Sequence, residues 1–245
     1  MRASKVTIKK EPSRKRGRPS LSETTQLDKQ AIIAKGLTLA RTNALHQITI
    51  TGIAKDFGVT PALIHYLIPG KDGLISGVMN AYYKKVCSRW PKNTDNWRQH
   101  LESVALHVYK MQSTYRGVVL YTSTHNRYRI VQNVSQGETD YGLKYLDLLI
   151  QSAMTMGLDP HNTMILCENF VDLITGAARQ AIDTRLPRQH ETYLRSIISN
   201  LNMQKYPGID FVGDELYSTD PDSLFESSLR MLLDAFEIRR ADLLA

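Results

Sequence analysis

The sequence predicts an all-α protein in which a three-helix, helix-turn-helix domain is followed by a larger helical domain. Apolar residues recur at helical spacing along most of the 245-residue chain. Alternating apolar runs joined by hairpin turns, which would indicate a sheet, are not found. Between residues 49 and 71, two short helices with separate start signals flank Gly58, which is the pattern of a helix-turn-helix.

The positive charge of the chain is concentrated at its N-terminal end. The formal net charge is +7, and residues 1–18 hold eight basic residues against one acidic residue, which accounts for the whole excess. Because apolar residues are few, residues 1–24 are predicted to form a disordered basic arm. A basic arm ahead of a helix-turn-helix indicates a nucleic-acid partner.

Within this arm, Arg16-Gly17-Arg18-Pro19 resembles the core of an AT-hook. An extended backbone of this kind lets arginine side chains enter narrow A·T-rich minor grooves, where the negative potential is enhanced. Arg16 and Arg18 are therefore candidate DNA-binding residues. The alternative is a solvated tail that makes only phosphate contacts, and in both cases binding weakens with salt.

The sequence argues against several classes of protein. No apolar run is long enough to span a membrane, and the charged N-terminus lacks the apolar stretch of a secretory signal. Cys87 and Cys167 form neither a Cys-x-x-Cys pair nor a zinc pattern. Catalytic and phosphate-binding motifs are missing, so an enzyme is not expected. We expect a cytoplasmic bacterial protein, associated with the nucleoid when bound to DNA, with no metal and no cofactor.

Start and stop signals define the helices of the first domain. A first helix is predicted over residues 26–41 from its apolar face. Thr49 and Thr60 are N-cap candidates for the next two helices, because their hydroxyls can accept a hydrogen bond from the following turn. Pro61 suits the first helical position, where its missing N–H has no cost. Gly58 ends the second helix in the left-handed conformation.

The third helix has one buried face and one exposed face. Ile64 and Ile68 are predicted to face inward, together with Leu63 or Leu67. Helical spacing then turns four residues outward as the expected readers of base edges: Pro61, Ala62, His65 and Tyr66.

The segment GVTPALIHY, followed by PGKDGLI, resembles the DNA-binding domain of the tetracycline repressor (TetR/AcrR) family. The resemblance is strong through residue 80 and fainter beyond. Two positions differ from the usual family pattern: Leu67-Ile68 replaces a His-Phe pair, and Asn43 stands where a Gly usually closes the first helix.

The resemblance implies a DNA-binding domain over residues 25–89 that ends in a linking helix, residues 71–89. Lys71 lies at the start of that helix, where free N–H groups attract phosphate. The alternative for Lys71 is a lysine that faces solvent. The domain's expected DNA-contacting residues are Thr49, Thr51, Thr60, Pro61, Ala62, Leu63, His65, Tyr66 and Lys71.

Trp90-Pro91 marks the start of the second domain, residues 90–245, which the resemblance implies is a ligand-binding and dimerisation domain. Proline and glycine residues predict a long loop over residues 202–222. Helices are predicted over residues 97–113, 118–125, 137–156, 162–182, 190–201 and 223–244.

The last helix carries an apolar stripe with steps of four, three and four residues, which needs a packing partner. In the resembled family, the last two long helices of each chain form a four-helix dimer interface. The implied contact residues are Leu166, Phe170, Leu173, Ala177, Phe225, Leu229, Leu232 and Phe236. The alternative is that both stripes pack only within their own chain.

A ligand pocket is expected between the helices of the second domain, since such pockets are mostly apolar with a few polar groups. The same description fits an ordinary core, so the candidates remain open to that alternative. They are Trp97, His107, Tyr109, Met111, Arg116, His125, Tyr128 and Phe170.

The sequence therefore predicts a homodimeric, sequence-specific transcriptional regulator, most simply a repressor released from double-stranded DNA by a small-molecule effector. Two helix-turn-helix units related by a two-fold axis would read a palindromic operator. The alternative is a DNA-binding protein with an architectural role, or one controlled by a partner protein, and without an inducer.

Overall fold

The computed structural model describes residues 27–124, 130–183 and 186–244. Every regular element in these ranges is a helix, and none is a strand, which confirms the predicted all-α class. The basic arm falls outside the described ranges. So do four predicted site residues: Arg16, Arg18, His125 and Tyr128.

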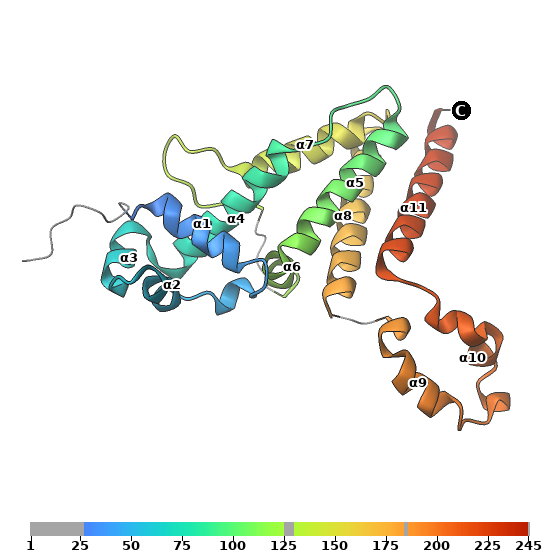
Figure 1. Ribbon diagram of the computed structural model, residues 1–245. Helices are drawn as coiled ribbons and strands as arrows, with labels where there is room; N and C mark the ends of the chain where they lie inside the picture. Colours follow the sequence, from blue (N-terminus) through green and yellow to red (C-terminus); the bar gives the residue numbers. More distant parts are fainter. Residues whose placement is uncertain (1–26, 125–129, 184–185, 245) are drawn as a thin grey trace, which may run out of the picture.

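The N-terminal part is a three-helix unit packed against a long fourth helix (Figure 1). Its elements are α1 (Lys29–Leu39), the 3-10 turn η1 (Leu45–Gln47), α2 (Ile50–Phe57), α3 (Pro61–Leu67) and α4 (Gly70–Ser88). Helix α1 begins later than predicted because Asp28 caps it. The Asp28 Oδ1 accepts a hydrogen bond from the Ala31 backbone N–H at 2.7 Å.

Glycines allow α1 and α4 to approach each other closely. A Cβ atom at Gly36 would lie 2.6 Å from Val78 Cγ2, and one at Gly77 would lie 2.7 Å from Ile33 Cδ1. Both distances are shorter than non-bonded carbons tolerate, so an alanine at either position would require the facing side chain to move. The contact fixes α4 against the three-helix unit.

The C-terminal part is a bundle organised around one central helix. Its long elements are α5 (Trp97–Thr114), α6 (Arg116–Thr122), α7 (Tyr141–Met154), α8 (Pro160–Asp183) and α11 (Pro221–Leu244). Helix α8 contacts each of the other four. Fully buried apolar side chains fill the spaces between them, among them Val104, Leu149, Phe170 and Leu233.

Helix α7 begins at Tyr141 rather than at residue 137 as predicted. Asp140 is its N-cap, and Oδ1 accepts from the N–H groups of Gly142 at 2.8 Å and Leu143 at 3.1 Å. Gly137 has a φ of 84° and belongs to the preceding loop. The helix therefore starts where a side chain can satisfy its free N–H groups.

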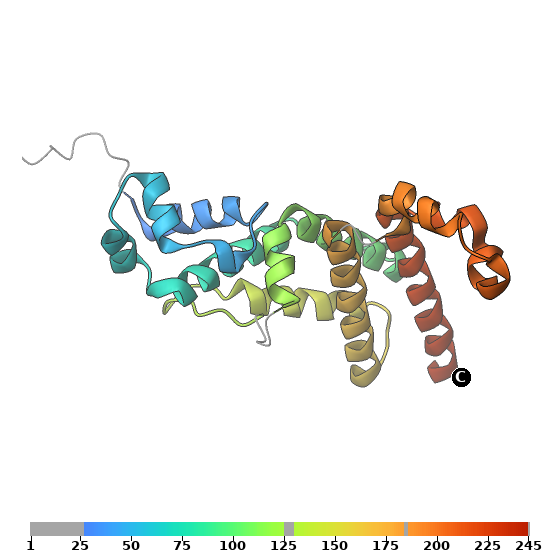
Figure 2. The ribbon, with the colours of Figure 1, turned by 90° about the horizontal axis from the view of Figure 1, so that it is seen from below.

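The predicted long loop at 202–222 is wrong in part, because this stretch contains short helices. Helix α9 (Glu191–Ile198) leads into η3 (Met203–Lys205), α10 (Pro207–Val212) and η4 (Gly213–Tyr217), while η2 (Pro187–His190) precedes α9. Pro207 starts α10 at its first position instead of breaking the chain, since that position needs no N–H. In Figures 1 and 2 residues 186–220 project from the bundle as a separate segment.

The two parts meet at α4 and at the start of α6. Helix α4 packs on α1 at one end and on α7 at the other. At α6, the Gly117 backbone N–H donates to the Ala40 carbonyl at 2.8 Å. A Cβ atom at Gly117 would lie 1.9 Å from the Asn43 carbonyl oxygen, so the contact requires glycine.

We expect Gly117→Ala to destabilise the protein by about 1–3 kcal/mol, because the new methyl group overlaps a backbone atom. Gly176→Ala in α8 is the matched control, since a Cβ atom there has open space around it. The control should stabilise the protein by about 0.5–1 kcal/mol through helix propensity. Urea unfolding monitored by circular dichroism measures both changes, and equal midpoints for the two variants would contradict the contact.

Candidate nucleic-acid interface and C-terminal cavity

Helices α2 and α3 form the predicted helix-turn-helix. Thr49 caps α2, and its Oγ1 accepts from the Gly52 N–H at 3.0 Å. Gly58 ends α2 with a φ of 65°, and the Val59 N–H returns to the Ala54 carbonyl at 2.9 Å. These bonds close a tight turn in which left-handed backbone favours glycine.

The start of α3 is as predicted, but the bond expected from its cap is absent. Thr60 is the N-cap in extended conformation, and Pro61 follows it as the first residue of the helix. The Thr60 side chain makes no capping hydrogen bond. The Leu63 N–H instead donates to the Thr60 backbone carbonyl at 3.1 Å. The hydroxyl of Thr60 is therefore exposed at the start of the helix and free to contact another molecule.

Helix α3 presents an unusually open face. Ile64 and Ile68 are buried, whereas Tyr66 is 86% exposed and His65 is also exposed. Of the two leucines left open by the sequence, Leu67 is partly buried and Leu63 is 41% exposed. Pro61 and Ala62 share the exposed face. In Figure 1 helix α3 lies at the end of the molecule far from α11.

Two exposed threonines and a fixed lysine border this face. Thr49 and Thr51 lie at the start of α2. The Lys71 ammonium donates to the His46 carbonyl at 2.7 Å, which joins the start of α4 to η1. The lysine keeps two further N–H donors. Gln47, next to His46, is also exposed, but it was not among the predicted DNA contacts. The bond from Lys71 to His46, which brings η1 beside Lys71, joins residues far apart in the sequence and could not be predicted from it.

A cavity of about 530 Å³ lies among α4, α5, α6, α7 and α8 in the C-terminal part. Tyr82 and Tyr83 on α4 and Tyr145 on α7 form its aromatic wall; the rings of Tyr83 and Tyr145 are 5.2 Å apart. Burial raises the pKa of Tyr82 and that of Tyr145 well above the usual value. Ionisation of these hydroxyls is thus even less favourable than in an exposed tyrosine.

Polar groups are few in this cavity. The Gln112 amide donates to Thr175 Oγ1 at 3.2 Å, while Gln112 Oε1 is buried without a hydrogen-bond partner among the described residues. Arg179 is held by the Asp183 carboxylate at 3.2 Å and by the Ser123 carbonyl at 3.3 Å. The lining also includes Asp172, so the cavity combines an aromatic wall with an unused acceptor and with side chains of both charges, and is able to orient a small polar ligand.

Among the residues predicted to line a pocket, Tyr109 and His107 are packing residues instead. Tyr109 stacks on Phe225 with ring centroids 4.3 Å apart, and its hydroxyl donates to Asp222 at 2.8 Å. Burial, followed by this bond, raises the pKa of Tyr109 to about 12. His107 contacts the Val86 carbonyl at 2.9 Å. The prediction did not include Gln112, which is the α5 residue that reaches the cavity.

The other described candidates also lie away from this cavity. Trp97 and Met111 are half-buried against the core, Phe170 is fully buried, and Arg116 is exposed with its guanidinium on the Ile182 carbonyl at 3.1 Å. The periodicity of α5 identified its buried face. The periodicity did not show which residues of that face pack against α8 and α11, and it did not show that Gln112 is the residue that faces the cavity.

No protein-family model matches the sequence, and no curated protein matches it. Solved structures do resemble the whole arrangement. Apo ActR from Streptomyces coelicolor is 14% identical with a TM-score of 0.71, covering 89% of this chain and 98% of ActR. TetR from Acinetobacter baumannii AYE is 18% identical with a TM-score of 0.58, covering 88% of this chain and 99% of that one. A further Streptomyces coelicolor TetR is 17% identical with a TM-score of 0.66, covering 85% and 97%.

The protein has the TetR-family fold. This confirms the fold expected from the helix-turn-helix residues and extends it to the C-terminal bundle. At such low identities the shared property is the fold, so the roles of individual residues have to be argued from their positions in this chain.

In this TetR fold, the residues predicted for a dimer interface form a seam within one chain. Leu166, Phe170, Phe225, Leu229 and Phe236 are all buried between α8 and α11 or against neighbouring helices. Leu173, Ala177 and Leu232 are partly buried beside them. For Leu166, Phe170, Phe225, Leu229 and Phe236 the predicted dimer contact is wrong, because burial within their own chain leaves no surface for a second copy. For Leu173, Ala177 and Leu232 it stays a prediction.

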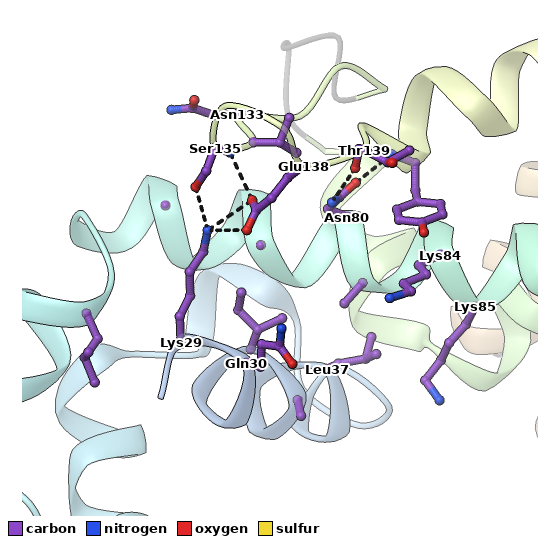
Figure 3. Close-up of a pocket in the computed structure, with 18 of the residues that line it drawn as sticks. Lys29, Gln30, Leu37, Asn80, Lys84, Lys85, Asn133, Ser135, Glu138 and Thr139 are labelled. Atoms are coloured by element: carbon purple, nitrogen blue, oxygen red, sulfur yellow. Dashed lines mark hydrogen bonds and ion pairs between the residues drawn. The ribbon is translucent and has the colours of Figure 1, made fainter. Parts of the chain in front are cut away.

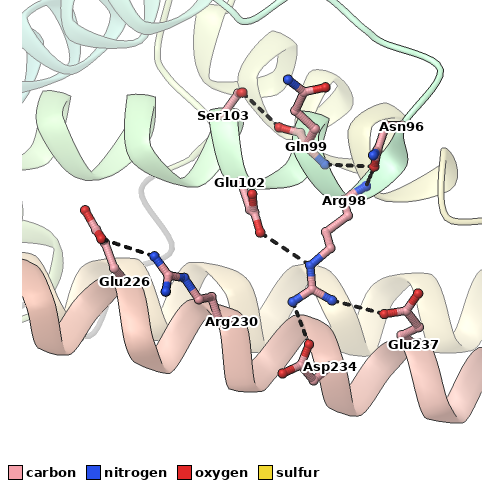
Figure 4. Close-up of polar contacts among 9 residues, drawn as sticks. All are labelled: Asn96, Arg98, Gln99, Glu102, Ser103, Glu226, Arg230, Asp234 and Glu237. Carbon is pink, nitrogen blue, oxygen red and sulfur yellow. Dashed lines mark hydrogen bonds and ion pairs between the residues drawn. The ribbon is translucent and has the colours of Figure 1, made fainter.

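An ion network fixes α11 on its other neighbour, α5. The Arg98 guanidinium contacts Asp234 at 2.5 Å, Glu237 at 3.0 Å and Glu102 at 3.4 Å (Figure 4). With its inner face on α8 and this side on α5, α11 turns a third face to solvent. Met231 and Ile238 lie there with exposures of 68% and 66%.

Three further observations concern a reactive thiol, a metal site and a membrane-spanning helix. Burial raises the pKa of the Cys167 thiol to about 11, so it is protonated and unreactive at neutral pH. His, Cys, Asp and Glu side chains form no metal-binding group within the described part of the chain. Among the helices that the structure describes, none is both long and apolar enough to cross a membrane.

We expect Ile64→Ala to destabilise the protein by about 2–5 kcal/mol, because it leaves a cavity between α3 and the rest of the unit. Tyr66→Ala, two residues away, should change the free energy of unfolding by less than about 0.5 kcal/mol, since its ring is exposed. Denaturant unfolding gives both values. A large loss of stability for Tyr66→Ala would show that the ring has a packing role.

Proposed function

We propose that the protein is a sequence-specific DNA-binding transcriptional regulator that acts as a homodimer and is a repressor released by a small molecule. The observation that carries the proposal is the exposed face of α3. On this face Tyr66 is 86% exposed and His65 beside it is also exposed, so neither side chain packs in the core of the domain. Such a face suits the major groove, where side chains meet base edges.

The neighbouring groups have a different expected role. Thr49, Thr51, Thr60 and Lys71 surround the α3 face and carry hydroxyl, N–H or ammonium donors. Donors of this kind contact phosphates and position a protein on DNA without reading sequence. The hydrogen bond that holds Lys71 to η1 reduces the freedom of its side chain, so less entropy is lost when it meets a phosphate.

Dimerisation would use the outward faces of the two longest helices. On α11 the exposed apolar residues are Met231, Ile238 and Leu243, and on α8 they include Met164. Apolar side chains exposed this far are typical of a surface that a second copy covers.

Release by a small molecule would use the C-terminal cavity. ActR has been solved with actinorhodin, and a variant TetR with minocycline. In this chain Tyr82 and Tyr83 line the cavity from α4, and the same helix carries Lys71 about 16 Å away along its axis. A ligand that favours one position of α4 would thereby change the spacing of the two α3 helices, which is a population shift between two dimer conformations.

A second candidate is a DNA-binding regulator controlled by a partner protein. The projecting segment favours it, since Tyr193 is 67% and Phe211 89% exposed. A thermal-shift screen against metabolites, combined with release from DNA, distinguishes the two. Stabilisation together with release supports the effector, and a complete lack of both supports the partner protein.

Selection of bound duplexes from a random pool tests the proposed function directly. The expected result is an enriched palindrome, because two α3 helices related by two-fold symmetry read inverted half-sites. Enrichment of a single unrepeated motif would contradict the dimer. Lack of any enrichment would contradict sequence-specific binding.

Two variants distinguish a side chain that reads base pairs from one that contacts only phosphates. Tyr66→Ala should relax selectivity at its base pair, with a cost of about 1–3 kcal/mol on the preferred site only. Lys71→Ala should weaken all sequences alike and lower the salt dependence by about one phosphate contact. Titrations at several salt concentrations against the selected and a scrambled duplex measure both. A uniform loss for Tyr66→Ala would exclude it as a base reader.

Combining Met231→Glu with Ile238→Glu should convert the dimer to monomer, since like charges facing each other across an interface cost several kcal/mol. Phe211→Glu is the control, because it adds the same charge to an exposed apolar site on the projecting segment. Light scattering after gel filtration gives the mass. A double variant that stays dimeric would place the interface elsewhere.

A further inference from the structure

A second cavity, of about 800 Å³, lies between the two parts of the molecule. We call it the junction cavity. Figure 3 shows α1 and α4 on two sides of it and the loop of residues 133–139 on a third. It shares no lining residue with the C-terminal cavity described above.

The floor of the cavity is apolar. Gly73, Gly77 and Ala81 follow one another at intervals of four, so they lie in a line along α4 on the side of the cavity. Pro69 covers Gly73 and Ile33 of α1 packs directly on Gly77, so the floor consists of these two side chains together with Leu37 and Ala81. The result is an apolar floor about 12 Å long between the levels of residues 73 and 81 on α4.

The loop above the cavity is held firmly on α4. The Asn80 amide donates to the Thr139 carbonyl at 3.1 Å, and its oxygen accepts from the Tyr141 N–H at 2.8 Å. Nearer the start of α4, Ser76 Oγ accepts from the Asn133 N–H at 2.6 Å. These bonds to backbone groups keep the cavity formed in the absence of a ligand.

An ion pair joins α1 to this loop at one end of the cavity. The Lys29 ammonium lies 3.2 and 3.1 Å from the two Glu138 oxygens and donates to Ser135 Oγ at 3.0 Å (Figure 3). The Ser135 N–H, and then Lys29, hold the pKa of Glu138 below its usual value. The positive charge of Lys29 is thus already balanced.

Two further lysines at the other end have no such partner. Figure 3 shows Lys84 and Lys85 on α4, at the opposite end of the cavity from Lys29. Lys84 lies 5.6 Å from the ring centre of Tyr141. Neither ammonium group forms an ion pair with a carboxylate in the ranges that the structure describes. An apolar floor that ends at two uncompensated cations is complementary to an amphipathic anion.

We propose that the junction cavity binds an amphipathic anion: an apolar body with one carboxylate, sulfonate or phosphate group. The charged group meets Lys84 and Lys85, and the apolar body lies along Ala81 and the side chains of Ile33 and Leu37. This occupant touches α1, α4 and the 133–139 loop at once. It therefore favours the joined arrangement of the two parts, because a separated arrangement offers only some of these contacts.

The inference is independent of the proposed function, because binding is measured without DNA. Anilinonaphthalene sulfonate is a suitable probe, since it is an apolar anion that fluoresces when its rings leave water. We expect it to bind the full-length protein, and decanoate to displace it at lower concentration than decanol, which lacks the charge. Equal displacement by decanol would overturn the role given to the lysines.

Variants locate the bound probe. Lys84→Gln combined with Lys85→Gln removes the charges from exposed positions, and Ala81→Leu fills the floor while keeping the charges. Each should weaken binding of the sulfonate by about tenfold, as expected for the loss of a charge contact or of contact area. Lys110→Gln, an exposed lysine on α5, is the control and should bind as the unchanged protein does.

Three outcomes would overturn the proposal. One is no binding of the sulfonate to the unchanged protein, and another is equal affinity in the double lysine variant and the unchanged protein. The third is an equal loss in the Lys110→Gln control. Circular dichroism of each variant checks the fold, and the lysine variants keep the test decisive if Ala81→Leu fails to fold.

Discussion

The close packing of α4 against α1 is the constraint on which the other surfaces of this protein depend. Gly36 and Gly77 let the side chains of Val78 and Ile33 pack directly on the backbone of the opposite helix, where a larger residue would displace them. Helix α4 can then serve both parts of the molecule, with Lys71 at the helix-turn-helix and Tyr82 in the C-terminal bundle. Closely packed interiors change between discrete arrangements rather than deforming smoothly, so a displacement at one end of α4 is felt at the other.

The two cavities along α4 differ in chemistry because they face different neighbours. Around Tyr82, Tyr83 and Tyr145 the helix is covered by other helices of the bundle, and the cavity there has an aromatic wall with side chains of both charges, Asp172 and Arg179, in its lining. On the junction side α4 is covered by α1 and a loop, and Lys84 and Lys85 remain exposed at the edge. One helix thus contributes to an aromatic site and to a cationic site, which suit ligands of different chemistry.

Affinity and selectivity for DNA have separate origins in the proposed function. Beyond residue 18 the chain is formally neutral, so the general attraction to phosphate falls to the N-terminal arm and to single groups such as Lys71. Selectivity falls to the α3 face, where Tyr66 and His65 are exposed and take little part in packing. The face can therefore vary with little effect on the fold, whereas Ile64 beneath it cannot.

The sequence by itself determined the helix-turn-helix, including the cap at Thr49, the left-handed Gly58 and the outward direction of Tyr66. These features depend on residues within one helical turn, so a local pattern is enough to define them. Only the tertiary structure decided which apolar stripe meets which. It paired the stripes of α8 and α11 within one chain, which leaves Met231 and its neighbours to face outward, and it gave the cavity Gln112 rather than the aromatic residues of α5. The physical reason is that an apolar stripe fixes only that a face is buried, while its partner depends on contacts between helices far apart in the chain.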